Sequence, residues 1–230
     1  MKRGISATMP YDSIVLGKSI LFQGLSHSEL EHAFAFFHAE EALYKKGDYL
    51  LRLGERVNRF GLVLRGTVQV SMDDLNGNRI IMANVSPGGT FGESHCYLQT
   101  QESPINIVAG SDCHILWLAT SGLQQPNHED AIFLQRFIAM LANRTLEMND
   151  RIQILSKRTL RSKLVTFFSL LIKRYDDDSF AIPFDRSAMA DYLGTDRSAL
   201  SRELSHMQAE GLLRFRHNRF EILNAHHWHD

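Results

Sequence analysis

The sequence has few cysteines, few prolines and no long apolar run. Its 230 residues contain two cysteines, Cys96 and Cys113, and five prolines. Two thiols without a CxxC spacing indicate reduced cysteines in a reducing compartment, and they exclude the four-cysteine cluster of an iron-sulfur sensor. The early stretch SIVLGKSILF is interrupted by Lys18, so it predicts neither a secretory leader nor a membrane span. We therefore expect a cytoplasmic protein without a membrane partner.

The chain also lacks a large net charge, because its 25 Lys and Arg residues nearly balance its 26 Asp and Glu residues. A nucleic-acid partner therefore has to be inferred from local patterns rather than from the overall charge. The length exceeds that of a common single domain, which favours two domains.

The first part of the chain predicts one short helix followed by antiparallel strands. Residues 26–37 have apolar residues at helical spacing, and Ser26 with Glu29 forms a capping-box pattern. Residues 44–118 consist of short β-branched and apolar runs separated by turn signals, of which Asn76-Gly77 is the strongest. These runs predict a β-roll or barrel.

A long helix is predicted next, since no glycine or proline occurs between Pro126 and Pro183. Its apolar stripe is close to a heptad repeat and predicts a helix of about 30 residues that requires a partner, most simply a second copy of the chain. Packing of this helix on its own roll is the alternative. The stripe consists of Phe133, Phe137, Met140 or Leu141, Arg144, Met148, Ile152 and Leu155. A further amphipathic helix is predicted over residues 159–175.

Residues 185–207 have the spacing of a helix-turn-helix. Asp185 is placed to cap one helix, Gly194 permits a sharp turn, and Thr195 or Asp196 is placed to cap the next. In that second helix the apolar residues Leu200, Leu204 and Met207 define the core face. The opposite face then carries Arg197, Ser198, Ser201, Arg202 and Ser205.

This polar face and the segment after it predict a DNA-binding surface. A recognition helix reads base edges with its N-terminal residues, where arginine can bind guanine through two hydrogen bonds. The segment LLRFRHNRFEIL then alternates apolar residues with Arg214, Arg216 and Arg219, as in a hairpin wing that contacts phosphates. A solvated helix with ordinary surface arginines is the alternative.

With GTFGE at residues 89–93 and LGTDRSALSREL at residues 193–204, the chain resembles the Crp/Fnr superfamily of bacterial transcription regulators over almost its whole length. The resemblance implies an α+β protein in three parts: an effector-sensing, jelly-roll-like β-roll (1–126), a dimerisation helix (127–157) and a winged helix-turn-helix (158–230). It implies a homodimer that binds palindromic double-stranded DNA, an unknown small-molecule effector in the roll, and RNA polymerase as a further partner.

Two departures from the family pattern concern specificity. Many members carry a glutamate after the first arginine, where this chain has Ser198, so the usual half-site is not expected. In the cyclic-nucleotide-binding members a Gly-Glu pair, here Gly92-Glu93, is followed by an arginine that neutralises the cyclic phosphate. This chain has Ser103-Pro104 at that place, so we expect no binding of cyclic AMP or cyclic GMP.

The effector itself is not identified by the sequence. The predicted pocket combines the roll with the long helix, and its residues are Gly92, Glu93, His95, Ser103, Pro104, Arg144, Met148 and Asn149. His95 or Cys96 is a candidate haem ligand, and a Cys96 thiolate is a candidate oxidant sensor. An inert histidine and a buried thiol are favoured over both, because no second ligand is evident. Arg144 either binds an anionic effector or forms an ion pair with Glu93 or Glu147, and the ion pair is favoured.

Two other functions are weighed against a DNA-binding regulator. A cupin-like metalloenzyme needs several histidines and a glutamate on neighbouring strands, whereas the roll offers His95 and His114 without a His-x-His pair. No catalytic constellation and no other metal site is evident, so we expect no enzyme. A dimeric sensor that acts only through protein partners is the second alternative, and the polar face of residues 197–205 argues against it.

Overall fold

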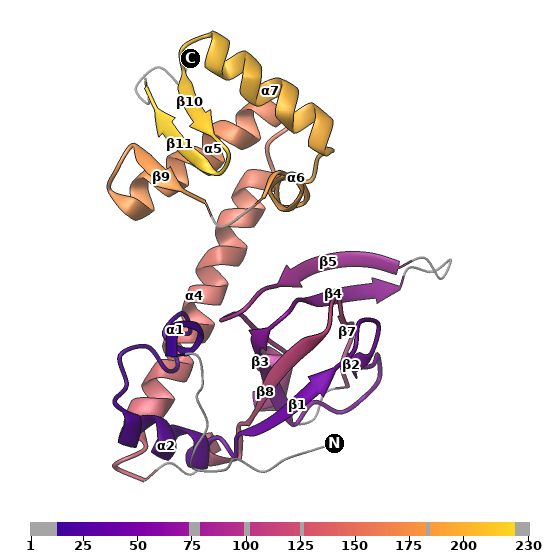
Figure 1. Cartoon of the computed structure of the whole chain (residues 1–230), viewed down its shortest axis with the longest axis vertical. Coiled ribbons are helices and arrows are strands. Elements are labelled where there is room, and N and C mark those ends of the chain that lie inside the picture. Colours follow the sequence, from indigo (N-terminus) through magenta and orange to yellow (C-terminus); the bar gives the residue numbers. More distant parts are fainter. Residues whose placement is uncertain (1–12, 74–78, 99–101, 125–126, 183–184, 224–230) are drawn as a thin grey trace. The chain divides into compact units, whose positions relative to one another are not determined.

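The computed structural model describes residues 13–73, 79–98, 102–124, 127–182 and 185–223 (Figure 1). The chain forms two compact units, residues 1–142 and 143–230. The division falls within the longest helix, α4 (Ala131–Leu155), whose ends therefore belong to different units.

The first unit contains two four-stranded antiparallel sheets, as expected for a β-roll. One has the order β1 (Glu40–Tyr44), β8 (Cys113–Ala119), β3 (Arg59–Arg65), β6 (Thr90–Phe91). The other has the order β2 (Tyr49–Leu51), β7 (Asn106–Ala109), β4 (Val68–Asp73), β5 (Arg79–Val85). The strands β4 and β5 pair as the predicted hairpin requires, and its Asn76-Gly77 turn lies outside the described residues.

Helices accompany the first of these sheets. They are α1 (Ser13–Leu16), α2 (His27–Phe36), α3 (Glu93–Leu98), a 3₁₀ turn η1 (Ser121–Gln124) and the beginning of α4. The predicted capping box of α2 is present, with the Ser26 side chain accepting from the Glu29 amide and the Glu29 carboxylate accepting from the Ser26 amide. The short helix α3 was not predicted, because six residues are too few to show a periodic pattern.

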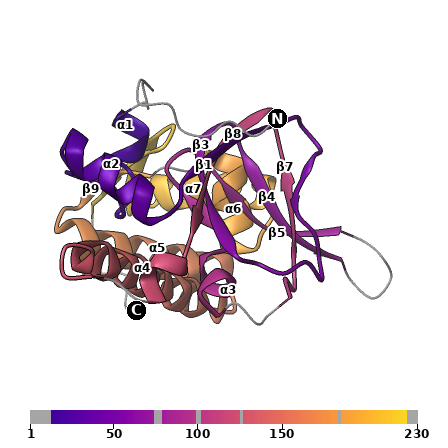
Figure 2. The same cartoon turned by 90° about the horizontal axis from the view of Figure 1, so that it is seen from below.

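The sheet β1-β8-β3-β6 is buried on both faces. On one side Phe60 and Leu116 pack with Phe37 of the α2 end and Phe133 of α4, and Figures 1 and 2 show these helices beside β3 and β8. On the other side Val63, Ile115 and Trp117 pack against residues of the second sheet, including Val68 and Ile107. Because both faces are covered, β3 is a nearly continuous apolar run rather than an alternating one.

The predicted stripe on the long helix is wrong in its first half. Phe133, Phe137 and Met140 are buried in the core of the first unit, so this half packs on its own roll. Four exposed apolar residues, Ile138, Met148, Ile152 and Leu155, lie on a neighbouring face. The helix also begins four residues later than predicted, because Asn127 and Asp130 bond each other's amides in a capping turn.

The second unit is a three-helix domain with a small antiparallel sheet. Its core is formed by side chains from every element, among them Leu164, Met189, Leu204 and Phe220, together with Ile154 from the end of α4. The elements are α5 (Leu160–Tyr175), α6 (Arg186–Leu193), α7 (Arg197–Ala209), β9 (Ser179–Ala181), β10 (Leu213–Arg216) and β11 (Arg219–Ile222). The sheet has the order β10-β11-β9, and β9 is a third strand that was not predicted.

Local signals define the helix-turn-helix in this unit. Asp185 caps α6 and Asp196 caps α7, each accepting a hydrogen bond from an amide three residues later. Gly194 ends α6 in the left-handed region with φ of 61°, which a side chain disfavours. These features agree with the predicted positions of the caps and the turn.

Candidate nucleic-acid interface and effector region

The helix α7 has one buried and one exposed face, as its apolar spacing predicts. Leu200, Leu204 and Met207 are completely buried in the core of the second unit. Arg197 and Arg202 are exposed on the other side. Within the described ranges neither guanidinium has a hydrogen bond or ion pair, so both remain available to a ligand.

The serines on this face are already bonded within the protein. The Ser198 hydroxyl donates to the Asp196 carboxylate, and the Ser205 hydroxyl donates to the Ser201 carbonyl at 3.0 Å. The bond from Ser198 and the amide of Ala199 together lower the pKa of Asp196. Ser201 is half-buried. The two arginines are therefore the side chains of this face best placed to bind an anion or a base.

A residue missed by the sequence reasoning fixes α7 to α5. Arg161 donates from Nε to Glu203 at 2.7 Å, and from Nη1 and Nη2 to the two oxygens of Glu210, also at 2.7 Å. These two carboxylates raise the pKa of Arg161. Glu203 and Glu210 are 42 and 49 residues from Arg161 in the sequence, so no local pattern identified these ion pairs. The bidentate geometry restrains the orientation of α7.

The hairpin β10–β11 has the predicted apolar and cationic faces. Leu213, Phe220 and Ile222 are buried, whereas Arg214, Arg216 and Arg219 are exposed. Arg216 lies opposite Arg219 in the strand register, which brings two positive charges together near the hairpin tip. Arg214 lies 3.7 Å from Glu221, a loose ion pair on an exposed surface.

The tip of this hairpin is attached to the rest of the unit. His217 has a positive φ of 54°, and Asn218 exchanges hydrogen bonds with Ile182 in both directions. The Arg186 guanidinium lies beneath the hairpin and donates to the His217 carbonyl at 3.2 Å. Arg186 was also missed, because a single arginine at the start of α6 carries no distinguishing pattern.

In the roll, the predicted effector residues are in different environments. Gly92 has a positive φ of 81° and precedes α3, where Glu93 is buried and His95 is half-buried. The buried Ser103 hydroxyl donates to the Ile105 carbonyl and accepts from the Ile105 amide. Pro104 is exposed. The position expected to hold a phosphate thus provides neither a cation nor a free hydroxyl.

The other predicted pocket residues belong to the second unit. Arg144 lies 3.5 Å from Glu147 on the next turn of α4, as favoured from the sequence. Met148 and Asn149 are exposed. Because these three residues and the roll residues lie in separate units, a shared pocket stays a prediction.

Cys96 has the environment of a structural thiol. Its side chain is completely buried among the residues that join the sheet to the helices, and Sγ lies 3.3 Å from the Thr120 hydroxyl. Burial raises its pKa, which disfavours the thiolate needed for oxidant sensing or haem ligation. Among the described residues no group of three or more His, Cys, Asp or Glu is arranged to hold a metal ion.

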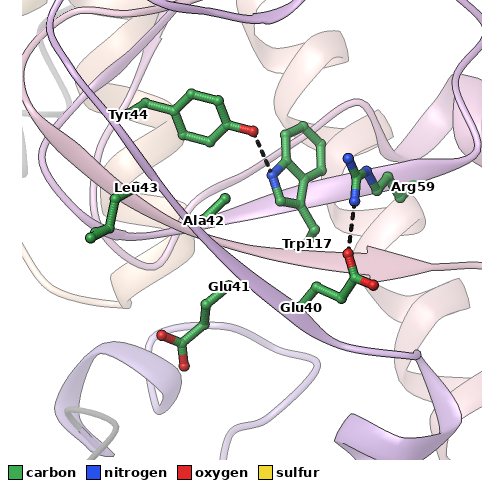
Figure 3. A pocket seen from close by; sticks show the side chains of 7 residues that line it. All are labelled: Glu40, Glu41, Ala42, Leu43, Tyr44, Arg59 and Trp117. Atoms are coloured by element: carbon green, nitrogen blue, oxygen red, sulfur yellow. Dashed lines mark hydrogen bonds and ion pairs between the residues drawn. The ribbon is translucent and has the colours of Figure 1, made fainter. Parts of the chain in front are cut away.

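A small pocket of about 130 Å³ lies along the edge strand β1 (Figure 3). Four of its polar groups bond in pairs: Arg59 donates to Glu40 at 3.1 Å, and the Trp117 indole donates to the Tyr44 hydroxyl at 3.0 Å. None of the predicted effector residues lines it. The lining residues are Glu40, Glu41, Ala42, Leu43, Tyr44, Arg59 and Trp117.

Each of the two units contains a segment that matches a known protein family. Residues 41–125 match the cyclic nucleotide-binding domain family, and residues 162–227 match the Crp-like helix-turn-helix domain family. The chain belongs to the Crp/Fnr superfamily. Like other members, this Crp/Fnr protein is a transcription regulator that joins a cyclic nucleotide-binding fold to a helix-turn-helix domain.

Individual relatives cover between 76% and 90% of the Crp/Fnr chain. The cyclic AMP receptor protein of Thermus thermophilus is 26% identical over 90% of this chain and 94% of its own. The cAMP-activated global transcriptional regulator CRP of Pasteurella multocida is 22% identical over 76% of this chain and 86% of its own. The FixK2 structure from Bradyrhizobium japonicum shares the fold, with a TM-score of 0.55 and 24% identity over 83% of this chain and 96% of that one.

No helix in the described part of the chain has both the length and the apolar character needed to cross a bilayer. The relative from Pasteurella multocida is named a transcriptional regulator.

Proposed function

We propose that this Crp/Fnr protein is a homodimer that binds a palindromic DNA operator and responds to an effector other than a cyclic nucleotide. In this proposal residues 1–126 sense the effector, 127–157 form the dimer helix, and 158–230 bind DNA. The observation that carries the proposal is the exposed face of α7, where Arg197 and Arg202 have no described partner beside a hairpin with three exposed arginines.

The chemistry of this surface fits the major groove. Arg197 and Arg202 are five residues apart in the first half of α7, where a recognition helix contacts base edges. Each guanidinium can form two hydrogen bonds with guanine O6 and N7. The exposed Arg214, Arg216 and Arg219 of the hairpin are suited to phosphate contacts, which fix the position of the helix without reading sequence.

Dimerisation is proposed through the exposed face of α4. Five apolar residues and Thr145 follow one another along this face at spacings of three and four residues, which is the pattern of a two-stranded coiled coil. Two copies side by side would cover side chains such as Met148 and Ile152, which are 57% and 63% exposed in one chain. The positions are Ile138, Leu141, Thr145, Met148, Ile152 and Leu155.

The effector is proposed to lack a cyclic phosphate. The Ser103 hydroxyl is bonded within its own turn, and Pro104 has no amide hydrogen to donate. A buried phosphate without a paired cation is strongly disfavoured. Titration calorimetry should therefore detect no micromolar binding of cyclic AMP or cyclic GMP, and heat of binding at micromolar concentration would overturn this part of the proposal.

The DNA-binding role is tested by the double variant Arg197→Ala, Arg202→Ala. Loss of two base contacts worth about 1–3 kcal/mol each should abolish sequence-specific binding in a fluorescence anisotropy titration. Arg174→Ala is the matched control, because that arginine is bonded to Asp150 at 2.6 Å on another surface of the unit. Unchanged specific binding by the folded double variant would refute the role.

The dimer is tested by a pair of neighbouring substitutions on α4. Ile152→Glu places a charge on the exposed apolar face and should produce monomers in sedimentation equilibrium. Gln153→Glu places the same charge one position away, at an exposed polar site, and should leave the dimer intact. If both variants sediment as dimers, the interface lies elsewhere.

A further inference from the structure

The small pocket along the edge strand β1 lies on the face of its sheet that packs toward the second sheet. Ala42 and Tyr44 of β1 and Trp117 of β8 belong to the apolar cluster between the two sheets. In the described part of the chain β1 pairs with β8 alone, so it forms a free edge. The pocket therefore combines a wall that belongs to the core with residues that solvent reaches, such as Glu40.

The alternation of side chains along β1 decides which charged groups face the pocket. Glu40 lies on the side of Trp117, whereas Figure 3 shows Glu41 directed away from that ring. On the opposite face the Glu41 carboxylate is bonded to His114 at 2.7 Å. The side that faces Trp117 therefore has one carboxylate, that of Glu40, and one guanidinium, that of Arg59.

These two charged groups form an ion pair with unused hydrogen-bonding capacity. Arg59 donates from Nη1 to Glu40 at 3.1 Å, and its guanidinium carbon lies 4.9 Å from the centre of the Trp117 ring. Among the described residues the Arg59 guanidinium has no other hydrogen bond, so most of its five N–H donors remain for a ligand. Both side chains are partly exposed, and such an ion pair contributes little to stability. A ligand can rearrange it at small cost.

The presence of both charges in a small space favours a ligand that also carries both. A cation bound to Glu40 would lie beside the Arg59 guanidinium, and an anion bound to Arg59 would lie beside the Glu40 carboxylate, so either is repelled by one member of the pair. A zwitterion places its ammonium group on Glu40 and its carboxylate on Arg59, where two parallel hydrogen bonds can form. An α-amino acid has these two groups on one carbon atom, which matches two charged side chains in direct contact.

The volume of the pocket limits the size of this ligand. The volume is about 130 Å³, which is far below the roughly 300–1,000 Å³ of sites for drug-sized molecules. It is also several times the roughly 30 Å³ that one water molecule occupies in the liquid. Figure 3 shows Ala42 and the ring of Tyr44 beside Trp117, and these groups offer an apolar surface. The pocket is too small for a nucleotide and matches an amino acid with a small apolar side chain.

We propose that this pocket binds a small apolar α-amino acid, with its ammonium group on Glu40, its carboxylate on Arg59 and its side chain against Ala42 and Tyr44. The site is separate from the predicted effector region, because none of the predicted effector residues lines it. It consists of residues of the first unit alone. The β-roll thus has a second ligand site, whose occupancy does not depend on whether the protein binds DNA.

The fluorescence of Trp117 measures binding in the full-length protein. The chain has two tryptophans, so Trp228→Phe leaves Trp117 as the single reporter. L-alanine, L-valine and L-leucine are titrated separately, each beside the amine and the carboxylic acid that lack one of its two charged groups. At least one amino acid should give a saturating change with a Kd below about 1 mM and should raise the Tm. Its two analogues should bind at least about tenfold more weakly, because each leaves one charge of the pair without its partner.

Substitutions assign the binding to this pocket. Glu40→Gln and Arg59→Gln each remove one charge and should weaken binding at least about tenfold. Ala42→Leu keeps both charges but fills the space of the ligand side chain, so it should weaken binding as well. Lys45→Gln is the matched control, because it removes another exposed ion pair of the β-roll, with Asp112 at 2.7 Å, and should bind normally.

Several results would overturn the proposal. Absence of saturable binding by all three amino acids would show that the pocket takes no such ligand, and equal binding of an analogue would show that one charge suffices. Normal affinity of the folded Glu40→Gln and Arg59→Gln variants would place the binding elsewhere. If thermal melting shows that neither of these variants folds, normal binding by Ala42→Leu overturns the proposal, and failure of all three to fold does so too, because these groups then serve the fold.

Discussion

In the winged helix, α7 and the hairpin β10–β11 each have one face in the core and an exposed face that carries candidate residues. Arg197 and Arg202 project from the same helix whose Leu204 is completely buried. In the β-roll, by contrast, the candidate residues Glu93 and Ser103 are themselves buried. A surface for a large ligand can thus be separated from the core, whereas a pocket for a small ligand is built from it.

The helix α4 has buried residues near its beginning and exposed apolar residues near its end. Phe133 and Phe137 are buried in the first unit, whereas Met148 and Ile152 are exposed in the second. Substitutions of buried side chains should therefore change stability, and substitutions of exposed side chains that cap no helix should change binding or assembly with little change in stability. The following predictions test this distinction.

The largest effect is expected for Phe137→Ala. Removing a buried aromatic ring from the core of the first unit should lower the free energy of unfolding by about 3–5 kcal/mol, because it leaves a cavity. Chemical denaturation measures this loss. Gln135→Ala, at an exposed site on the same helix, should change the free energy little. The base preference of the protein should be unaltered, and a changed preference would break the distinction.

The second effect is a loss of stability in alkali due to Cys113. Burial, with a smaller contribution from Asp112 and Asp48, raises the pKa of this thiol to about 11. The thiol loses its proton in the unfolded chain near pH 8.5 but not in the folded chain, so stability falls as the pH rises from about 8.5 to 11. Denaturation at a series of pH values should show this fall. Cys113→Ala should reduce it, and an identical pH profile for that variant would contradict the assignment.

A smaller loss is expected for Asp196→Ala. The Asp196 carboxylate caps α7 by accepting from the Ala199 amide, and such caps contribute about 1 kcal/mol. Thermal unfolding measures the change. Asp191→Ala, at an exposed site inside α6, provides a control that removes a carboxylate without removing a cap. Equal melting temperatures for the two variants would show that the cap contributes nothing.

The smallest effect is expected for Ser198→Ala. The hydroxyl already donates to Asp196, so its loss should leave the base preference unchanged and alter stability by only a few tenths of a kcal/mol. Ser198→Glu should instead change the preferred half-site, because glutamate can accept a hydrogen bond from cytosine. Selection of bound duplexes compares the two variants. A new base preference for Ser198→Ala would show that the serine reads DNA.

Local patterns predicted most of the second unit. Asp185, Gly194 and Asp196 identify the ends of α6 and α7 because caps and left-handed turns depend on neighbouring residues. The three-residue strand β9 and the pairing of Arg161 with Glu210 depend on residues far apart in sequence, and no short pattern contains them.

The burial of residues along the long helix also could not be predicted from a local pattern. Its length follows from the absence of glycine and proline, but two apolar faces overlap along it, and a single periodic stripe cannot assign Phe137 to the core and Ile138 to the surface. In the roll, sequence placed Glu93 and Ser103 near the expected pocket. Their burial and the internal bonds of Ser103 depend on the folded sheet, so the effector could not be predicted.

Selection of bound duplexes from a random pool, with purified protein at fixed salt and no added ligand, tests the central claim most directly. If nothing is enriched, the selection is repeated with cell extract to supply an effector. We predict enrichment of a two-fold palindrome whose half-sites lie about one helical turn apart, because two recognition helices related by a dimer axis meet the same face of DNA. Failure to enrich any palindrome in both selections would contradict a dimeric, sequence-specific DNA-binding regulator.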